Sequence, residues 1–501
     1  MLNTEFSELF TLTDWSIQTA SLVKTEHADF GLARQNGETK LIILSDTPDV
    51  LTRFDGERAP HGDQTLLIGA TNATNAAQLR LALPWLIARP LGTQTSAGFG
   101  DRLGLATPGH IHALRSVAGS IAPIFAQQSI REMTRTERTA QQVMDDAMWG
   151  VFGEGWRDGF GADADHLKTP ADIDCCAAAG FTFYTIDPGE YVDDRVYADD
   201  AALSQAFAAL PWADLQDSAA DLPTRYARPV DLESSAVTFD PAILQQAAVK
   251  YGRVVAHVHH MAQYLRQVSN QLFELEISVD ETNSVTSHAE HVYLATEFKR
   301  LGVTYVSLAP RYVGRFEKGV DYIGDLAAFR ADFAIHAEIA RAFGSYKLSL
   351  HSGSDKFGIY PIAAELTRGV VHLKTAGTSY LEALRTAAAL DPALFREMYA
   401  FARAHYETDR ASYHVSAELD KAPLPETITD GDLPTLLEQF DARQILHVTF
   451  GSTLIARNTN GSTRFKDQLL NVLRTHPEAY AAVLEKHFIR HLAPFANRKS
   501  S

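Results

Sequence analysis

One arrangement recurs through the middle of this 501-residue chain: a short apolar strand, a polar or ionisable strand end, and a stretch with helical periodicity. Strands that alternate with helices pair in parallel. Eight in succession predict a closed (β/α)8 barrel of the TIM type, in which the chemistry lies at the carboxyl ends of the strands. The predicted strands with their polar ends are 96–102, 121–131, 159–168, 181–189, 272–282, 303–311, 346–356 and 370–378.

The sequence on either side of this region has a different character, so we expect three parts. Residues 1–90 indicate a mixed α/β extension, residues 91–385 the catalytic barrel, and residues 386–501 a mainly helical extension. A stretch rich in proline and aspartate, at about 193–240, separates the fourth strand from the fifth and is predicted to be an insertion. The helical pattern at 241–269 then supplies the fourth barrel helix.

Charge and cysteine content exclude several classes of protein. A net charge of −17 without a basic stripe argues against a nucleic-acid partner. The two cysteines, Cys175 and Cys176, are adjacent, which excludes a disulfide framework and a CxxC metal motif. The amino terminus lacks the pattern of a signal peptide, and no apolar run is long enough to span a membrane. We therefore expect a soluble, cytoplasmic protein without a membrane partner; assembly into a homo-oligomer stays open.

Four of the predicted strands place ionisable side chains on one face, where an inert barrel would have valine or leucine. Alternate residues of a strand point to opposite sides, and the outward face of a barrel strand packs on helices. Buried charges are unfavourable unless they pair, bind a metal or line a wet cavity. The polar faces are Asp163 with Asp165; Glu274, Glu276 and Asp280; Lys347 with His351; and His372 with Lys374.

The strand end Asp163-x-Asp165-His166 is the strongest candidate for metal binding in the first half of the barrel. Carboxylate and imidazole donors together suit zinc, manganese, cobalt or nickel better than calcium. The predicted ligands of this divalent metal are His166, Asp163, Glu281 and His351. The alternative is a structural network of salt bridges between the acids and nearby basic side chains, namely Arg102, Lys168, Lys356 and Lys374.

The expected catalytic residues are Asp165, Glu276, Asp187 and Lys374. A lysine inside a barrel can form an imine with a carbonyl substrate. Beside several carboxylates and a metal, however, Lys374 is expected to stay protonated and to act through its charge.

A third set of polar residues at the strand ends is predicted to bind substrate. Arginines there can hold a substrate carboxylate through paired hydrogen bonds, although an internal aspartate is an equally good partner. His447, in the apolar, strand-like stretch Q-I-L-H-V-T-F-G-S, is assigned a structural role. The predicted substrate-binding residues are Arg102, Gln128, Arg131, Arg311, Ser352, Asp355 and Lys356.

Several of these strand ends, taken together, resemble the tagaturonate epimerase family. The resemblance covers residues 96–380 strongly and extends, less distinctly, to H-V-T-F-G and the carboxyl-terminal helices; the first 90 residues show no match. It implies a divalent-metal-dependent isomerase that interconverts D-tagaturonate and D-fructuronate; some members act on the neutral ketoses fructose and tagatose. The matching stretches are F-G-D-R-L-G, G-A-D-A-D-H-L-K, S-V-D-E-T, S-L-A-P-R-Y-V-G-R-F-E-K-G, L-S-L-H-S-G-S-D-K-F and H-L-K-T-A-G-T-S-Y-L-E-A-L-R.

The implied reaction inverts a carbinol carbon that is β to the ketone. Removing its hydrogen as a proton would leave a carbanion that no carbonyl delocalises, so retro-aldol cleavage and re-addition is favoured over metal-assisted proton exchange. Cleavage needs a base for the β-hydroxyl proton, and Glu276 or Asp187 is the candidate. Two alternatives remain: a metal-dependent aldolase or ketose epimerase acting on neutral or phosphorylated sugars, and a sugar-acid-binding protein without turnover.

Overall fold

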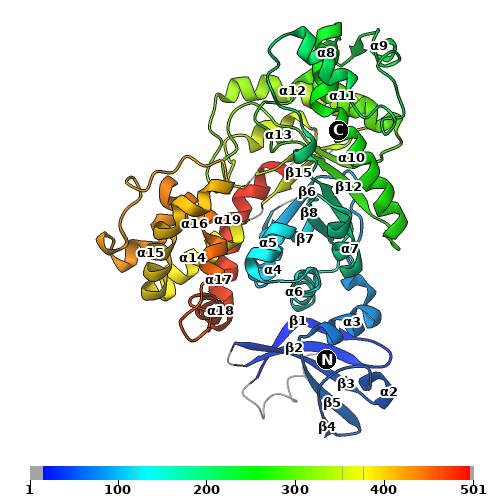
Figure 1. Cartoon of the computed structure of the whole chain (residues 1–501). Helices are drawn as coiled ribbons and strands as arrows, with labels where there is room; N and C mark the ends of the chain where they lie inside the picture. The colour runs from blue at the N-terminus through cyan, green and yellow to red at the C-terminus, as the bar shows by residue number, and fades with distance from the viewer. Residues whose placement is uncertain (1–14, 36, 118, 353, 376, 497–501) are drawn as a thin grey trace.

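All eight predicted strands form, and they close into a parallel barrel in the order β12-β13-β14-β15-β6-β7-β8-β9 (Figure 1). The computed structural model describes residues 15–496 except 36, 118, 353 and 376. The predicted fold class is confirmed: the chain folds as a (β/α)8 barrel. Its strands are β6 (Ser96–Gly100), β7 (Ala122–Ser129), β8 (Gly161–Leu167), β9 (Phe183–Ile186), β12 (Glu274–Ser278), β13 (Ser307–Ala309), β14 (Lys347–Leu350) and β15 (Val371–Lys374).

Helices connect the strands and cover the outer face of the barrel. Four of them begin with a capping box, in which a serine or threonine and an acid or amide three residues later satisfy free backbone N–H groups. In α5 and α7 the cap lies directly after the polar strand end, so it starts the helix there. The helices are α4 (Thr107–Ser116), α5 (Ile130–Thr136), α6 (Ala140–Gly153), α7 (Pro170–Ala179), α10 (Pro241–Val268), α11 (His288–Arg300), α12 (Leu326–Ala342), α13 (Tyr360–Leu366) and α14 (Thr378–Leu390).

An antiparallel sheet of five strands, in the order β1-β2-β3-β5-β4, precedes the barrel and lies below it in Figure 1. Alternate residues of β3 serve two apolar clusters: Leu41 and Ile43 join the main core, whereas Ile42 and Leu44 pack on the other face. The elements are β1 (Ser16–Lys24), β2 (Asp29–Gln35), β3 (Glu38–Ser45), α2 (Pro48–Leu51), β4 (Glu57–His61), β5 (Gln64–Ala70) and α3 (Ala73–Ala82).

The segment between β9 and α10 packs against the outside of the barrel helices. Its helix α8 contacts α10, and Val237 of its small hairpin joins Val292 of α11 and Ile339 of α12 in one apolar cluster. Ser234 adds two hydrogen bonds to the carboxylate of Glu338. The elements are α8 (Asp200–Ala208), α9 (Leu222–Arg225), β10 (Val230–Asp231) and β11 (Ala236–Val237).

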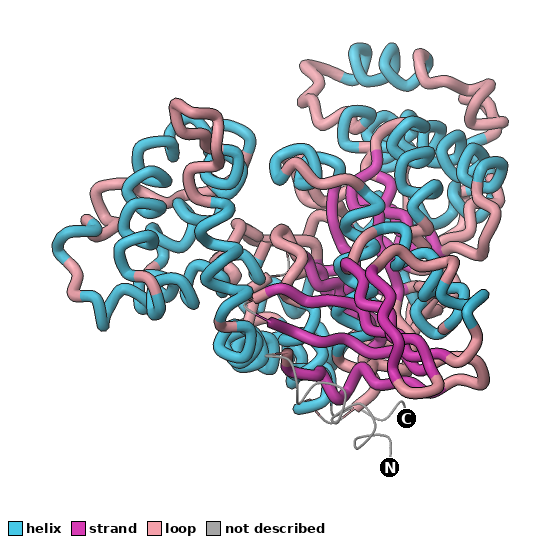
Figure 2. Tube along the Cα trace, turned by 90° about the horizontal axis from the view of Figure 1, so that it is seen from below, coloured by secondary structure: helices cyan, strands magenta, loops and turns pink. Residues whose placement is uncertain are grey.

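The chain after α14 is helical over the described residues, and Figure 2 shows these helices as a group without strands beside the sheet. The long helix α19 returns to the barrel and packs on α4, α13 and α14. None of the helices in the described part of the chain is both long and apolar enough to cross a membrane. The division into domains at residues 90 and 385 stays a prediction. The helices are α15 (Pro392–Asp409), α16 (Phe440–Val448), α17 (Phe450–Ile455), α18 (Lys466–Thr475) and α19 (Pro477–Ala496).

Three fully buried histidines, His110, His372 and His491, are expected to make the fold sensitive to acid. Burial lowers the pKa of each to about 3. The unfolded chain takes up protons on these side chains below about pH 6.5, and the folded chain does not. Their contribution to stability is therefore present above that pH and is lost as the pH falls, by about 1.4 kcal/mol per pH unit for each group.

Urea unfolding of the protein at about pH 7 and about pH 5.5 measures this loss. His110 makes a hydrogen bond to Ser379 and stacks on Phe99. His110→Gln keeps a polar group there but cannot take up a proton. We therefore expect the slope of the unfolding free energy against pH to fall by about 1.4 kcal/mol per pH unit, the contribution of one proton. An unfolding free energy that does not change between the two pH values would contradict this prediction.

Candidate active site

A β-bulge at the end of β8 turns two neighbouring side chains toward one cavity. In a regular strand, adjacent residues point to opposite faces, yet Asp165 and His166 both line the cavity inside the barrel mouth. The pairing of β8 with β9 shifts register between Ala164 and Leu167, and His166 has a φ of 55°, a left-handed conformation that is uncommon outside glycine. Asp165 Oδ1 lies 2.8 Å from His166 Nδ1 and orients the ring.

Lys374, the last residue of β15, lies among three carboxylates inside the barrel. Its Nζ is 2.5 Å from Asp165, 2.8 Å from Glu276 and 3.0 Å from Asp163, and it also donates to Thr185 Oγ1. Burial alone would lower the pKa of Lys374, but the carboxylates outweigh it and raise the pKa well above its usual range. The ammonium group is therefore charged, which supports an electrostatic role over imine formation.

The carboxylate of Glu276 is fully buried and surrounded by donors. It accepts hydrogen bonds from Ser307 Oγ at 2.6 Å and from Thr185 Oγ1 at 3.1 Å, and it pairs with His351 Nε2 at 2.7 Å. Burial would raise the pKa of Glu276, but Lys374 and His351 hold it well below its usual range. Glu276 is not among the described residues that line the cavity, so in this geometry it contacts Lys374 and His351 and not the open space of the mouth.

Asp163 lies deeper in the barrel than its place in the Asp163-x-Asp165-His166 stretch predicts. Its side chain is fully buried, and it accepts a hydrogen bond from Thr185 Oγ1 at 2.9 Å. Burial raises the pKa of Asp163 to about 7 despite the nearby ammonium of Lys374. The structure thus places this predicted metal ligand beneath the lysine, away from the imidazoles at the mouth.

Histidine and carboxylate donors gather at the mouth in two overlapping groups, each with its donor atoms within 4.8 Å of one another. The set contains three of the four predicted ligands, lacks Asp163, and adds Asp280 and Asp187. Mixed imidazole and carboxylate donors fit zinc, manganese, cobalt or nickel. The two groups are His166, Asp280 and His351; and His166, Asp187 and Glu281.

Three of the predicted substrate-binding residues lie at or near the mouth. Arg131 is exposed, with its guanidinium 5.4 Å from the centre of the Tyr413 ring. Ser352 lines the cavity, where its hydroxyl accepts a hydrogen bond from Lys318 at 2.6 Å. Gln128 instead lines a separate small pocket with residues of α6, and neither of its amide atoms is bonded to a described residue. Arg311 is half-buried directly after β13. Arg131, Arg311 and Ser352 are therefore the residues of this set that a ligand in the mouth can reach.

The other three predicted binding residues have internal partners instead. Arg102 pairs with Glu132 at 2.7 Å. Asp355 pairs with Arg443 at 2.9 Å and with histidines of α19, and Lys356 donates to three backbone carbonyls. Burial lowers the pKa of Lys356 to about 7. Asp355 and Lys356 therefore anchor the loop after β14, and neither lines the cavity.

Two cavity residues, Lys318 and His447, were not predicted from the sequence as site residues. The stretch around His447 belongs to helix α16 rather than to a strand, and it brings the buried ring against the cavity. Burial, with Arg102 nearby, holds the pKa of His447 well below its usual range, so the ring is neutral. The described lining residues are Asp165, His166, Lys318, Gly319, His351, Ser352, Ser354, Lys374 and His447.

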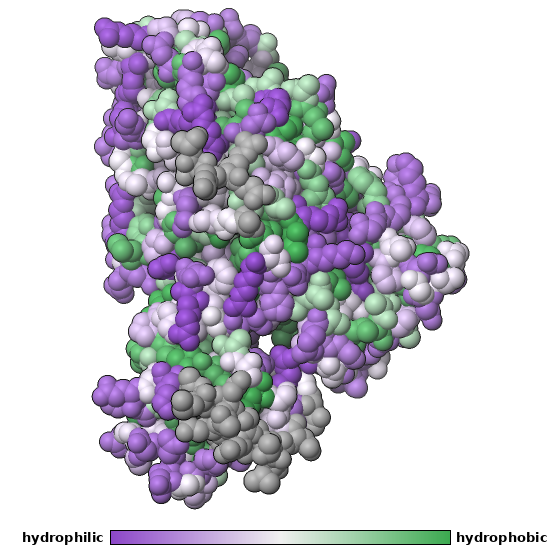
Figure 3. Space-filling view, turned by 180° about the vertical axis from the view of Figure 1, so that it is seen from behind, coloured by the Kyte–Doolittle hydropathy of each residue, from purple (hydrophilic) through white to green (hydrophobic). Residues whose placement is uncertain are grey.

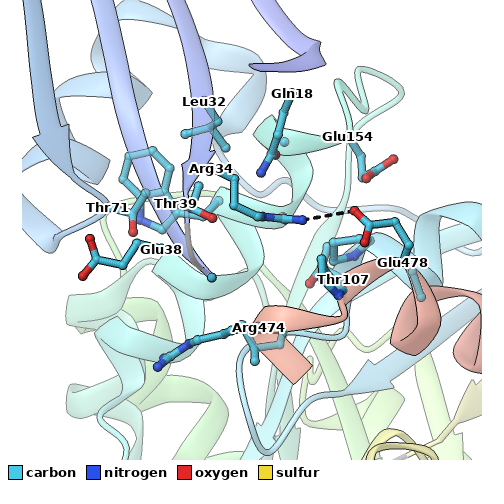
Figure 4. Close-up of a pocket in the computed structure, with 18 of the residues that line it drawn as sticks. Gln18, Leu32, Arg34, Glu38, Thr39, Thr71, Thr107, Glu154, Arg474 and Glu478 are labelled. Atoms are coloured by element: carbon cyan, nitrogen blue, oxygen red, sulfur yellow. Dashed lines mark hydrogen bonds and ion pairs between the residues drawn. The ribbon is translucent and has the colours of Figure 1, made fainter. Parts of the chain in front are cut away.

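A much larger cleft, of about 710 Å³, lies between the amino-terminal sheet and helices α4, α6, α18 and α19 (Figure 4). The space-filling view also shows the molecule hollowed between its lower lobe and the part beside it (Figure 3). Acidic and basic side chains mix along the cleft, and Arg34 pairs with Glu478 across it at 3.4 Å. None of the site residues predicted from the sequence is among its described lining, so we assign the chemistry to the smaller barrel cavity.

The family model for tagaturonate epimerases matches residues 18–495. The chain belongs to the tagaturonate epimerase family. It is 40% identical over 458 residues to a tagaturonate/fructuronate epimerase from Thermotoga maritima, an alignment that covers 91% of this chain and 92% of that protein. A glycerol complex and a native crystal structure of the fructuronate-tagaturonate epimerase from Cohnella laeviribosi each match with a TM-score of 0.92 at 34% identity, over 98% of both chains. The resemblance seen in the strand ends is thereby confirmed: the protein is an epimerase of the tagaturonate epimerase family.

Proposed function

We propose that the protein interconverts D-tagaturonate and D-fructuronate with the help of a divalent metal ion. The observation that carries the proposal is the barrel mouth of this member of the tagaturonate epimerase family. There the ammonium of Lys374, held by three carboxylates, lies beside the imidazole–carboxylate group of His166, Asp280 and His351. A buried positive charge next to metal donors suits a reaction in which negative charge develops on sugar oxygens.

Retro-aldol cleavage assigns distinct tasks to these groups. A base takes the β-hydroxyl proton, the bond between the α and β carbons breaks to give an enediolate and an aldehyde, and the aldehyde turns and adds again from its other face. Asp165 lines the cavity and is the base best placed to take that proton, with Lys374 at 2.5 Å to stabilise the charge. A divalent ion held by His166, Asp280 and His351 would supply Lewis-acid polarisation of the ketone oxygen.

A hexuronate carries a negative charge and is larger than the cavity, so the site must supply positive charge and must open. Arg131 at the rim and Lys318 over the cavity offer positive charge to a hexuronate carboxylate. The cavity has a volume of only about 30 Å³, room for about one water molecule. A six-carbon sugar acid therefore enters only when side chains that cover the mouth, such as those of Lys318 and His447, move aside.

A proton NMR time course with D-tagaturonate in deuterated water tests this function. EDTA-stripped protein is expected to be inactive, and added Mn²⁺ or Zn²⁺ should restore growth of the D-fructuronate signals. Absence of deuterium at the inverted carbon supports the retro-aldol route, whereas its incorporation would establish proton exchange. Ligand-induced stabilisation without turnover under any metal would overturn the proposal in favour of a binding protein. The same assay with D-tagatose and D-fructose measures the preference for the acid.

A further inference from the structure

Three potential metal donors meet outside the barrel, between the two helices that follow β12 and β13. His288 is the first residue of α11, and Asp332 and His336 lie one turn apart on the same face of α12. Asp332 Oδ1 is 3.1 Å from His288 Nε2 and 3.7 Å from His336 Nε2, and all three atoms lie within 4.8 Å of one another. Ligand atoms around tetrahedral zinc are about 3.3 Å apart, given bonds of about 2.0–2.1 Å, so small side-chain shifts would complete this geometry.

The ring of His336 is a second, independent observation that points to a bound metal ion. It is fully buried, and its Nε2 has no hydrogen-bond partner within the described part of the chain, which is unfavourable for a polar atom. Its Nδ1 lies 2.8 Å from Nδ1 of His291, whose Nε2 lies 2.6 Å from the hydroxyl of Tyr346. When His291 donates to Tyr346, it accepts from His336 Nδ1–H. The lone pair of His336 Nε2 is then free on the side of Asp332, as in a metal-binding histidine.

An ion pair alone explains only part of the arrangement. His288 and Asp332 satisfy each other, and the Val313 N–H donates to Asp332 Oδ2 at 3.4 Å, which fixes the carboxylate. His336 Nε2, at 3.7 Å from Asp332 Oδ1, is too far away for a hydrogen bond to that pair, whereas a cation would bind all three side chains at once. The Thr286 carbonyl also lies against the His336 ring.

We propose that His288, Asp332 and His336 form a second divalent-cation site of the zinc type. It shares no residue with the donor groups at the barrel mouth. The side chain of His288 is 36% exposed, which gives an ion a route from solvent. Bound zinc ties α11 to α12 and, through Val313, to the segment after β13, so the site stabilises the fold and takes no part in turnover.

Zinc content measured by mass spectrometry, after dialysis of the full chain against Zn²⁺, tests the site. We expect His288→Gln, a change at a partly exposed position, to remove one zinc per chain relative to the wild-type protein. His336→Gln should do the same and guards against a folding defect in the first variant. The matched control is His61→Gln, an exposed histidine on β4, which should leave the count unchanged. Added zinc should raise the melting midpoint of the wild-type protein by several degrees more than that of His288→Gln.

The variant His351→Asn distinguishes zinc bound at this site from a metal bound at the barrel mouth. That variant should keep the zinc that depends on His288, even if the proposed metal at the barrel mouth proves absent. An unchanged zinc content in both His288→Gln and His336→Gln would overturn the proposal. A loss of the same size in His61→Gln would overturn it too, since it would show adventitious binding to surface histidines.

Discussion

Replacing Lys374 with methionine is expected to reduce kcat by at least about 10²–10³-fold, the range for losing one preorganised group that stabilises developing charge. Methionine keeps the length of the side chain but removes the ammonium that lies within 3.0 Å of Asp163, Asp165 and Glu276. Three buried carboxylates then lack their cation. Leaving a buried ion pair without one partner costs about 3–5 kcal/mol of folding free energy, so urea unfolding should show a large loss as well.

Lys347→Met is the matched control for that experiment. Lys347 is an equally buried lysine of the barrel interior, but its Nζ donates to the Gly92 carbonyl at 2.9 Å and to Ser96 Oγ at 3.1 Å, near the start of its strand. We expect this variant to lose stability yet to keep kcat within a few-fold. If both variants lost turnover to the same degree, Lys374 would have only a structural role.

Asp165→Asn is expected to reduce kcat by about 10²–10⁴-fold, the usual contribution of a general base. Asp163→Asn should reduce it by less than about tenfold. Asp163, two residues earlier on the same strand, contacts the same lysine but does not line the cavity. Because burial raises the pKa of Asp163 to about 7, its carboxyl group is already partly protonated at neutral pH, and asparagine imitates that form.

Turnover of the two asparagine variants is measured by the NMR assay, together with their metal content. Metal content matters because Asp165 contacts His166, a proposed ligand, at 2.8 Å. A low kcat with an unchanged metal content assigns the loss to proton transfer. A large loss in Asp163→Asn with a small one in Asp165→Asn would reverse the assignment of the base.

The sequence predicts the barrel well because alternation within a strand is a local property. Lys347, Ser349 and His351 had to share a face whatever the rest of the chain did, and the same holds for His372 with Lys374. Repetition of this pattern over eight strands leaves a closed parallel barrel as the simplest fold. The strand ends that gather His166, His351 and Lys374 at one mouth follow from it.

Depth along the barrel axis could not be predicted in the same way. A period of two residues tells which face a side chain occupies but not which layer of the interior it reaches. Asp163 and Asp165 therefore looked equivalent in the sequence, whereas in the structure both contact Lys374 and only Asp165 lines the cavity. The bulge that follows Ala164 adds His166 to the same cavity. Register shifts between strands depend on neighbours that are distant in the sequence.

The sequence by itself determined the fold class, the family and the polar strand ends, because each rests on residues close together in the chain. Only the tertiary structure decided which polar groups meet. It brings His447 from α16 to the cavity, and it pairs Asp355 with Arg443 and with His487 of α19. It also places His288 of α11 beside Asp332 and His336 of α12. Such pairings depend on how helices pack against the barrel, where distances are set by side-chain fit over the whole core and not by local periodicity.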